Sequence, residues 1–343
     1  MISDNIFRHI LIDEKSVTPK YLQLTNSIIK GIEAGVIGKD EQLPSINDLS
    51  YELDISRDTA EKAYRHLKSL GIIGSVPGKG YFIAKTDFIQ TYRIFLLFNK
   101  LSAHKKIIYD SLVKTLGAKA AIDFYIYNND FGSFKKLLSD HSDGYTHYVI
   151  IPHFLEGGDT AHELINTLKG ANLILLDKKI AGITRSFGAV YENFEKDIFN
   201  ALVQALPQLE KYQTIKIIFP AYTYFPDEIL QGFYSFCREY AYNYVVVRNI
   251  KNESIQKGEV YINLMEDDLV VLLDKIRETN FRVGEDVGII SYNETPLKRF
   301  ILNGITTIST NFAAMGETTA QMILQNELQQ TAIPFTLTLR PSI

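Results

Sequence analysis

The chain has 343 residues, of which 46% are apolar and 22% charged, a composition typical of a globular protein with two or three domains. Its net charge of −4 excludes a uniformly basic nucleic-acid binder, and no apolar run is long enough to span a bilayer. A single cysteine, Cys237, excludes an intramolecular disulfide and a thiolate metal cluster, and the N-terminus lacks a signal-peptide pattern, which predicts a cytoplasmic protein.

The start of the chain predicts three helices. Residues 1–17 form a lead-in, and Thr18-Pro19 is a typical helix start because Thr caps a helix and Pro is tolerated at its first position. Ser45 is predicted to cap the start of a second helix, because the aspartate three residues later can accept a hydrogen bond from the backbone N–H of Ser45. Ser56 opens a third helix, which a glycine ends.

A hairpin follows the third helix. Residues 72–76 and 81–84 predict two short strands around a Gly-rich turn at 77–80. Three helices and a hairpin in this order predict a winged helix-turn-helix, a small α+β DNA-binding domain over residues 1–84. Residues 85–91 are the expected linker.

The remainder, residues 92–343, predicts an α/β fold. Near-continuous apolar strands alternate with helices, which indicates parallel sheets covered on both faces. About 250 residues of such units predict two lobes rather than one sheet domain. The expected strands cover residues 93–98, 122–127, 147–151, 173–176, 214–219, 244–247, 260–264 and 287–290. A long helix is expected over 193–209 and a last helix over 313–328.

Basic residues gather in the third helix and the hairpin. Residues 55–85 carry six Lys/Arg and two Asp/Glu, the pattern of a phosphate-contacting face. Arg57 can bond a guanine edge, and Ser56 and Thr59 can donate to phosphate. Lys79 stands between two glycines and can approach the minor groove or the backbone closely. The alternative for the arginine is a surface pair with the aspartate beside it.

Residues 18–83 resemble the winged helix of the GntR family. The matching residues are Pro19, Tyr21, Gln23, Gly31, Ile32, Gly35, Leu43-Pro44-Ser45, Leu49, Ser56-Arg57, Thr59, Ala63, Leu67, Gly71-Ile72-Ile73 and Gly78-Lys79-Gly80-Tyr81-Phe82. The DNA contacts that the resemblance implies are Ser45, Arg57, Thr59, Gly78 and Lys79. Asn47 and Glu61 stand where many or some members have arginine, so the resemblance does not imply an operator sequence. Asn47 can still bond adenine or phosphate.

Residues 92–343 resemble the sugar-binding domain of LacI/GalR regulators, which is related to periplasmic binding proteins. The best match is the run from Phe281 to Leu297, and further matches are Leu176-Asp177-Lys178-Lys179, Gly232-Phe233, Ile305-Thr306-Thr307-Ile308 and Leu337-Thr338-Leu339-Arg340-Pro341. The resemblance implies two lobes, a ligand in the cleft between them and hinge motion on binding.

Polar side chains at the ends of the predicted strands are the candidate effector contacts. Ligands of open α/β sheets bind at the carboxyl ends of the strands, and carboxylates or amides there can bond sugar hydroxyls. The residues predicted to bind the effector are Asn99, Lys100, Asp177, Glu192, Asn193, Tyr222, Glu266 and Asn293. For each of them the alternative is a helix cap or a turn residue. Asp227, Glu228 and Ile229 occupy the stretch where relatives have arginine, which favours a neutral sugar over a sugar phosphate. A sugar phosphate stays open as an alternative because of Lys100, His104 and Lys178.

The sequence therefore predicts a homodimeric regulator, a repressor of a carbohydrate-use operon, that binds double-stranded operator DNA under control of a small sugar. No catalytic or metal motif is present, so no enzyme activity, cofactor or membrane partner is expected. Two alternatives stay open. One is a sugar-binding or sugar-modifying α/β protein with an accessory DNA module, and the other is a ligand-free DNA-binding protein with a degenerate sensor.

Overall fold

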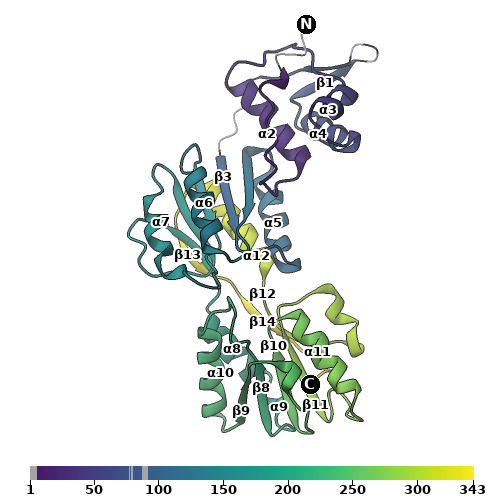
Figure 1. Cartoon of the computed structure of the whole chain (residues 1–343), viewed down its shortest axis with the longest axis vertical. Coiled ribbons are helices and arrows are strands. Elements are labelled where there is room, and N and C mark those ends of the chain that lie inside the picture. Colours follow the sequence, from purple (N-terminus) through teal and green to yellow (C-terminus); the bar gives the residue numbers. More distant parts are fainter. Residues whose placement is uncertain (1–5, 77, 79, 87–91) are drawn as a thin grey trace.

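The computed structural model of the chain describes residues 6–76, 78, 80–86 and 92–343. Three bodies follow one another along its longest axis (Figure 1). The N-terminal domain lies at one end, an α/β body that we call lobe 1 lies in the middle, and a second α/β body, lobe 2, lies at the other end. The predicted fold class, a small helical winged domain followed by two lobes with mainly parallel sheets, is confirmed.

The N-terminal domain packs three helices against a hairpin. Its elements are α2 (Lys20–Glu33), α3 (Ile46–Glu52), α4 (Arg57–Ser69) and the antiparallel strands β1 (Ile73–Val76) and β2 (Gly80–Ile83). Leu24, Leu49 and Leu67 are fully buried in its core because apolar residues recur at helical spacing. Ile6 and Ile10 are buried in the same core, so the predicted lead-in is partly built into the domain.

Two of the three predicted helix starts are as expected. Ser45 forms a capping box with Asp48, and the Ser56 side chain accepts a hydrogen bond from the backbone N–H of Thr59. The third prediction is wrong. Pro19 occupies the cap position, α2 begins one residue later, and the Thr18 hydroxyl makes no cap. That hydroxyl is used elsewhere, on a strand of lobe 1.

Lobe 1 is a parallel sheet with helices on both faces. Its strand order is β13-β7-β6-β5-β3-β4. The bounds are β3 (Tyr92–Phe98), β4 (Ala120–Ile126), β5 (His147–Ile150), β6 (Asn172–Asp177), β7 (Gly188–Tyr191), β13 (Gln330–Ala332), α5 (Ala103–Leu116), α6 (Phe131–Asp140), α7 (Ala161–Thr167) and α12 (Phe312–Gln325). Apolar side chains fill both faces of the sheet, as the near-continuous apolar strands predict.

Lobe 2 repeats this architecture with one antiparallel edge. Its order is β14-β12-β11-β10-β8-β9, and β14 runs antiparallel to β12. The bounds are β8 (Thr214–Ile218), β9 (Asn243–Val247), β10 (Glu259–Asn263), β11 (Val287–Tyr292), β12 (Thr306–Thr310), β14 (Phe335–Thr338), α8 (Phe194–Gln204), α9 (Leu206–Leu209), α10 (Glu228–Glu239) and α11 (Glu266–Arg277). The single helix predicted over 193–209 is divided, because Pro207 has no N–H to continue the ladder of the first helix.

The described chain passes between the lobes three times. The crossings lie between β7 and α8, between β12 and α12, and between β13 and β14. Residues that follow the strands of both lobes line the cavities between them, so the carboxyl ends of the two sheets face one another. Among the described helices, none is both long and apolar enough to cross a bilayer.

Candidate functional site

The DNA-binding candidates surround the junction of α3 and α4. The buried hydroxyl of Tyr64 donates to the Pro44 carbonyl at 2.7 Å and fixes α4 against the turn that starts α3. Ser45, Asn47 and Arg57 line one hollow of about 490 Å³, whose wall also includes Tyr81 of the hairpin. The structure therefore gathers three of the predicted contacts on one face.

Arg57 is exposed and has no ion-pair partner among the described residues. Its neighbour Asp58 pairs with Lys62 at 2.6 Å, so the alternative of a local Arg57–Asp58 pair does not form. Glu61 pairs with Arg65 at 2.7 Å, which compensates its charge on the helix surface. The first turn of α4 thus presents a free guanidinium, the group best suited to a guanine edge.

The other predicted contacts lie nearby. The hydroxyls of Ser56 and Thr59 are hydrogen-bonded to each other at 2.8 Å, and the Thr59 amide donates to the Ser56 hydroxyl. Both side chains therefore take part in the cap of α4. Thr59 lines a second hollow of about 650 Å³ together with three cations that the prediction did not select as contacts: Lys20, Lys62 and Arg65. Gly78 is exposed with a positive φ of 78°, which suits a tight turn, and Lys79 lies outside the described residues.

A buried charged cluster occupies the boundary between the lobes. Lys105, at the start of α5, donates from Nζ to the Asp177 carboxylate at 2.7 Å. The same carboxylate oxygen lies 2.7 Å from Nε2 of His153, which follows β5. Glu192 follows β7 and contacts Asp177. All four side chains are buried, so one ammonium faces two carboxyl groups away from water.

The two carboxyl groups of this cluster have opposite pKa shifts. Burial alone would raise the pKa of Asp177, but the Lys105 charge and the His153 hydrogen bond outweigh it and hold the pKa well below its usual value. Burial and then the Asp177 charge raise the pKa of Glu192 well above its usual value. Burial also lowers the pKa of His153. The opposite shifts mean that, when the pair holds one proton, Glu192 carries it rather than Asp177.

Buried polar atoms without hydrogen-bond partners gather at the same boundary. Tyr292 and Thr310 face Glu192 from lobe 2, yet their hydroxyls and the Glu192 Oε2 stand outside hydrogen-bonding geometry. The amide oxygens of Asn99 and Asn293 are also unpaired. Buried polar atoms are normally satisfied, so unpaired ones that gather at one place indicate where a ligand would supply partners.

Tyr224 separates two cavities at this boundary. The smaller one, of about 190 Å³, lies between the start of α5 in lobe 1 and the strand ends of lobe 2. Its lining includes Lys100, His104, Tyr224, Glu266, Asn293 and Lys298. Lys100 lies over the Tyr224 ring at 4.5 Å, an interlobe cation–π contact. Burial lowers the pKa of Lys298 to about 8, and its Nζ donates to the carbonyls of Tyr292 and Asn293.

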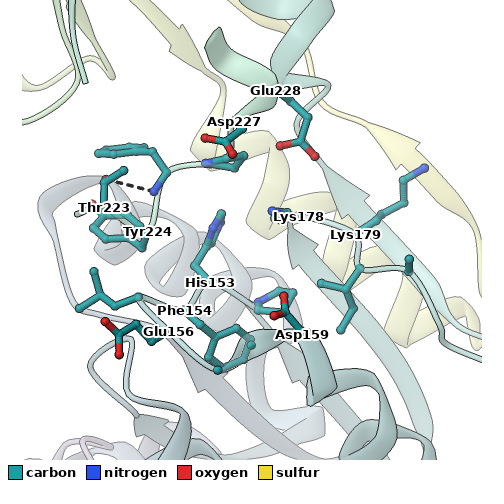
Figure 2. A pocket seen from close by; sticks show the side chains of 18 of the residues that line it. His153, Phe154, Glu156, Asp159, Lys178, Lys179, Thr223, Tyr224, Asp227 and Glu228 are labelled. Atoms are coloured by element: carbon teal, nitrogen blue, oxygen red, sulfur yellow. Dashed lines mark hydrogen bonds between the residues drawn. The ribbon is translucent and has the colours of Figure 1, made fainter. Parts of the chain in front are cut away.

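The larger cavity, of about 830 Å³, lies on the other side of Tyr224. Figure 2 shows His153 between Tyr224 and Lys178, with Asp227 and Glu228 of lobe 2 beyond them. The charged side chains that line this cavity are Glu156, Asp159, Lys178, Lys179, Asp227, Glu228 and Arg248. Carboxylates outnumber cations by one, so the cavity is not a basic anion site.

The structure brings most of the predicted effector residues to the boundary. Asn99, Asp177, Glu192 and Asn293 are buried there, and Lys100 and Glu266 line the smaller cavity. The Asp177 and Asn293 backbones both adopt positive φ, 71° and 65°, which turns each chain sharply as its strand ends.

Two predicted residues do not join them. Tyr222 is 63% exposed and lines neither cavity, whereas Tyr224 two residues later does. Asn193 is half-buried at the start of α8 and also lines neither.

Lys105, His153 and Lys298 were not predicted as contacts. His153 does follow a strand, so its position was a usable signal, whereas the two lysines carry no sequence pattern that marks them as buried.

Two family models match the chain. Residues 20–83 match the model of bacterial regulatory proteins of the gntR family, and residues 209–342 match the periplasmic binding protein-like domain. The chain carries a GntR-type helix-turn-helix domain and a periplasmic-binding-protein-like domain. The GntR-type domain contains Ser45, Asn47 and Arg57, and the second match contains Tyr224 and Asn293.

Curated relatives match the GntR-type domain. The HTH-type transcriptional regulator Rv1152 of Mycobacterium tuberculosis is 33% identical over 76 residues, which are 22% of this chain and 63% of that protein. The HTH-type transcriptional repressor YtrA of Bacillus subtilis is 32% identical over 84 residues, 24% of this chain and 65% of that protein. The arabinose metabolism transcriptional repressor of Geobacillus stearothermophilus is 29% identical over 72 residues, 21% of this chain and 20% of that protein. The chain thus spans less than two thirds of these relatives.

Solved structures match the two lobes. A LacI family transcriptional regulator from Enterococcus faecalis with bound ribose has a TM-score of 0.58 at 16% identity and covers 73% of this chain and 98% of that one. A dimeric Lac repressor has a TM-score of 0.60 at 16% identity with the same coverage. At this identity the likeness establishes a shared fold and nothing finer.

Proposed function

We propose that this protein is a transcription regulator that binds operator DNA through the GntR-type domain and binds a small neutral sugar between lobes 1 and 2. Relatives named as regulators or repressors support the first part, and repression of a carbohydrate-use operon in the cytoplasm is our specific proposal. The observation that carries the sugar proposal is the group of buried, unpaired acceptor oxygens at the lobe boundary, because sugar hydroxyls are donors for such atoms. The ribose-bound neighbour is consistent with it.

A neutral ligand fits this boundary better than a sugar phosphate. The lysines of the buried cluster and of the smaller cavity already have partners: Lys105 bonds Asp177, Lys298 bonds two carbonyls, and Lys100 rests on Tyr224. An added phosphate would have to displace one of these partners, whereas hydroxyl groups could donate to the free oxygens.

A screen by thermal unfolding tests the sugar. We expect one neutral mono- or disaccharide to raise the unfolding temperature, because a ligand at 100 times its Kd adds about 2.7 kcal/mol of stability. Tyr224→Ala is expected to abolish the shift, and Tyr222→Ala, at an exposed site outside both cavities, to preserve it. If sugar phosphates alone raise the unfolding temperature, the proposal of a neutral sugar is wrong. If no sugar raises the unfolding temperature, the alternative of a DNA-binding protein with a ligand-free, degenerate sensor is favoured. If the bound sugar is converted to a product, the alternative of a sugar-modifying protein with an accessory DNA module is favoured.

Substitution of Arg57 tests DNA recognition. With a duplex selected from a randomised pool by the wild-type protein, Arg57→Ala should weaken specific binding by about 1–3 kcal/mol while barely changing binding to unrelated DNA. Arg65→Ala is the matched control on the same helix, because that residue lines the basic hollow and should weaken both kinds of binding equally. Titration by fluorescence anisotropy at fixed salt measures both. Equal losses for the two Arg57 measurements would refute a base-reading role.

We also propose a homodimer, the form that reads two operator half-sites. Leu297, Phe300 and Leu302 are exposed within one short stretch of lobe 2, and such apolar clusters mark protein contacts. The mass of the protein in solution at micromolar concentration tests this proposal, and a monomer would contradict it.

A further inference from the structure

The segment before α2 lies along the edge of the lobe 1 sheet. β4 is the last strand of that sheet, with β3 as its only strand neighbour among the described residues, so its outer backbone groups need partners from elsewhere. The Val17 amide donates to the Phe124 carbonyl at 2.8 Å. The Thr18 hydroxyl accepts from the Phe124 amide at 2.8 Å and donates to the Ile122 carbonyl at 3.3 Å. This segment therefore pairs with the edge strand as a short backbone ladder would.

Side chains reinforce this contact. The Tyr125 hydroxyl donates to the Asp13 carboxylate at 2.8 Å. Lys30 of α2 lies 3.8 Å from the Asp123 carboxylate, and Arg93 of β3 lies 3.8 Å from that of Glu33. Opposite charges therefore meet at several points between the N-terminal domain and lobe 1.

The same segment is also tied to its own domain. The Gln23 side chain accepts from the Asp13 amide and donates to the Thr18 carbonyl, both at 2.8 Å. Ser27 bonds both backbone groups of Leu11, and Ile10 is buried in the domain core. Residues 13–18 are thus held on one side by α2 and on the other by β4.

We propose that residues 13–18 act as a strap that fixes the DNA-binding domain to lobe 1, so that the two move as one rigid body. The strap adds backbone hydrogen bonds on the edge of the sheet to the covalent connection between the two bodies and to the two ion pairs. The Thr18 hydroxyl is its central contact, since it serves two backbone groups of β4. Movement of lobe 1 at the three crossings would then reorient α4 directly.

Rotational motion of the N-terminal domain tests the strap without DNA or sugar, so the result is independent of the proposed regulator function. A fluorescent dye is attached through Tyr51→Cys, at an exposed site on α3, while the natural Cys237 is buried. In the full-length protein we expect the time-resolved anisotropy of the dye to decay with the tumbling of the whole molecule. The double variant Thr18→Val/Tyr125→Phe should add a component several-fold faster.

The control variants remove one threonine hydroxyl and one tyrosine hydroxyl that do not join the strap to β4. Thr25→Val removes a hydroxyl that bonds within α2, and Tyr148→Phe removes one that bonds within lobe 1, so the decay should stay like wild type. Hydrogen exchange is the second readout, and the Val17 amide should exchange about tenfold faster in the strap variant. If the double variant does not fold, Asp13→Asn and Tyr125→Phe singly give the same comparison. A fast component in wild type, or unchanged decay and exchange in folded strap variants, would overturn the proposal.

Discussion

Replacement of Lys105 by methionine is expected to lower the free energy of unfolding by about 3–5 kcal/mol at pH 7. Among the described residues, Lys105 supplies the ammonium that is bonded to Asp177, and its side chain is only 3% exposed. Methionine has a similar length and no charge, so it would leave the buried Asp177 carboxylate with its hydrogen bonds to His153 and Glu192 but without a cation. The cost of a buried, uncompensated charge exceeds what methionine gains by burying an apolar chain.

Lys106→Met is the matched control, because the next residue of the same helix is exposed and pairs only with exposed Asp110. Its effect should stay within about 0.5 kcal/mol. Denaturant unfolding at pH 7 measures both variants. The loss in Lys105→Met should shrink at acidic pH, where Asp177 can be protonated. Equal stabilities of the two variants at pH 7 would show that the cluster does not depend on Lys105.

The pH dependence of stability is expected to change in Glu192→Gln. The folded pKa of Glu192 is raised above the unfolded value of 4.5, so its contribution is fully present below that pH and is lost as pH rises towards the folded pKa. In this window the wild-type free energy of unfolding should fall by about 1.4 kcal/mol per pH unit from this group. Glutamine mimics the protonated acid, so the variant should lack this decline and exceed wild type in stability at pH 7–8.

The acid limb of the same curve should persist in the variant. The pKa of Asp177 is held low in the folded state, so its contribution is present above its usual pKa and is lost only as pH falls below it. Glu195→Gln, an exposed carboxylate three residues away, is the control and should keep the wild-type slope. Urea unfolding at a series of pH values between 3 and 8 measures the slopes of both limbs. A Glu192→Gln curve parallel to wild type would show that this carboxyl is ionised when folded.

The sequence carried more information about the fold than about the cleft. Turn residues, caps and helical spacing marked the N-terminal domain, because these are local effects. β12 was not predicted because its run Thr306-Thr307-Ile308-Ser309-Thr310 is mostly polar, although it is buried in the sheet. β7, β13 and β14 have only three or four residues each, too few for a periodic pattern.

Site residues were predicted correctly where a strand ends. They were not predicted in irregular loops or where the partner of the residue lies far away in the sequence. Asp177 and Asn293 could be selected because apolar runs end there. Tyr222 was selected instead of Tyr224 because a loop without period does not indicate which side faces the cleft. Lys105 resembles any helical lysine, and its burial depends on Asp177, a partner 72 positions away. Thr18 resembled a helix cap because its partner, β4, lies more than 100 positions further along the chain.

The three crossings between the lobes also determine when lobe 1 can form during synthesis. α12 and β13 belong to lobe 1 but are translated after nearly all of lobe 2. Until residue 332 has left the ribosome, α5 lacks the helix that covers it and β7 is an open edge. The N-terminal domain therefore emerges first, while the platform to which it attaches is completed almost last. Chaperones are expected to meet this chain mainly in the interval between those two events.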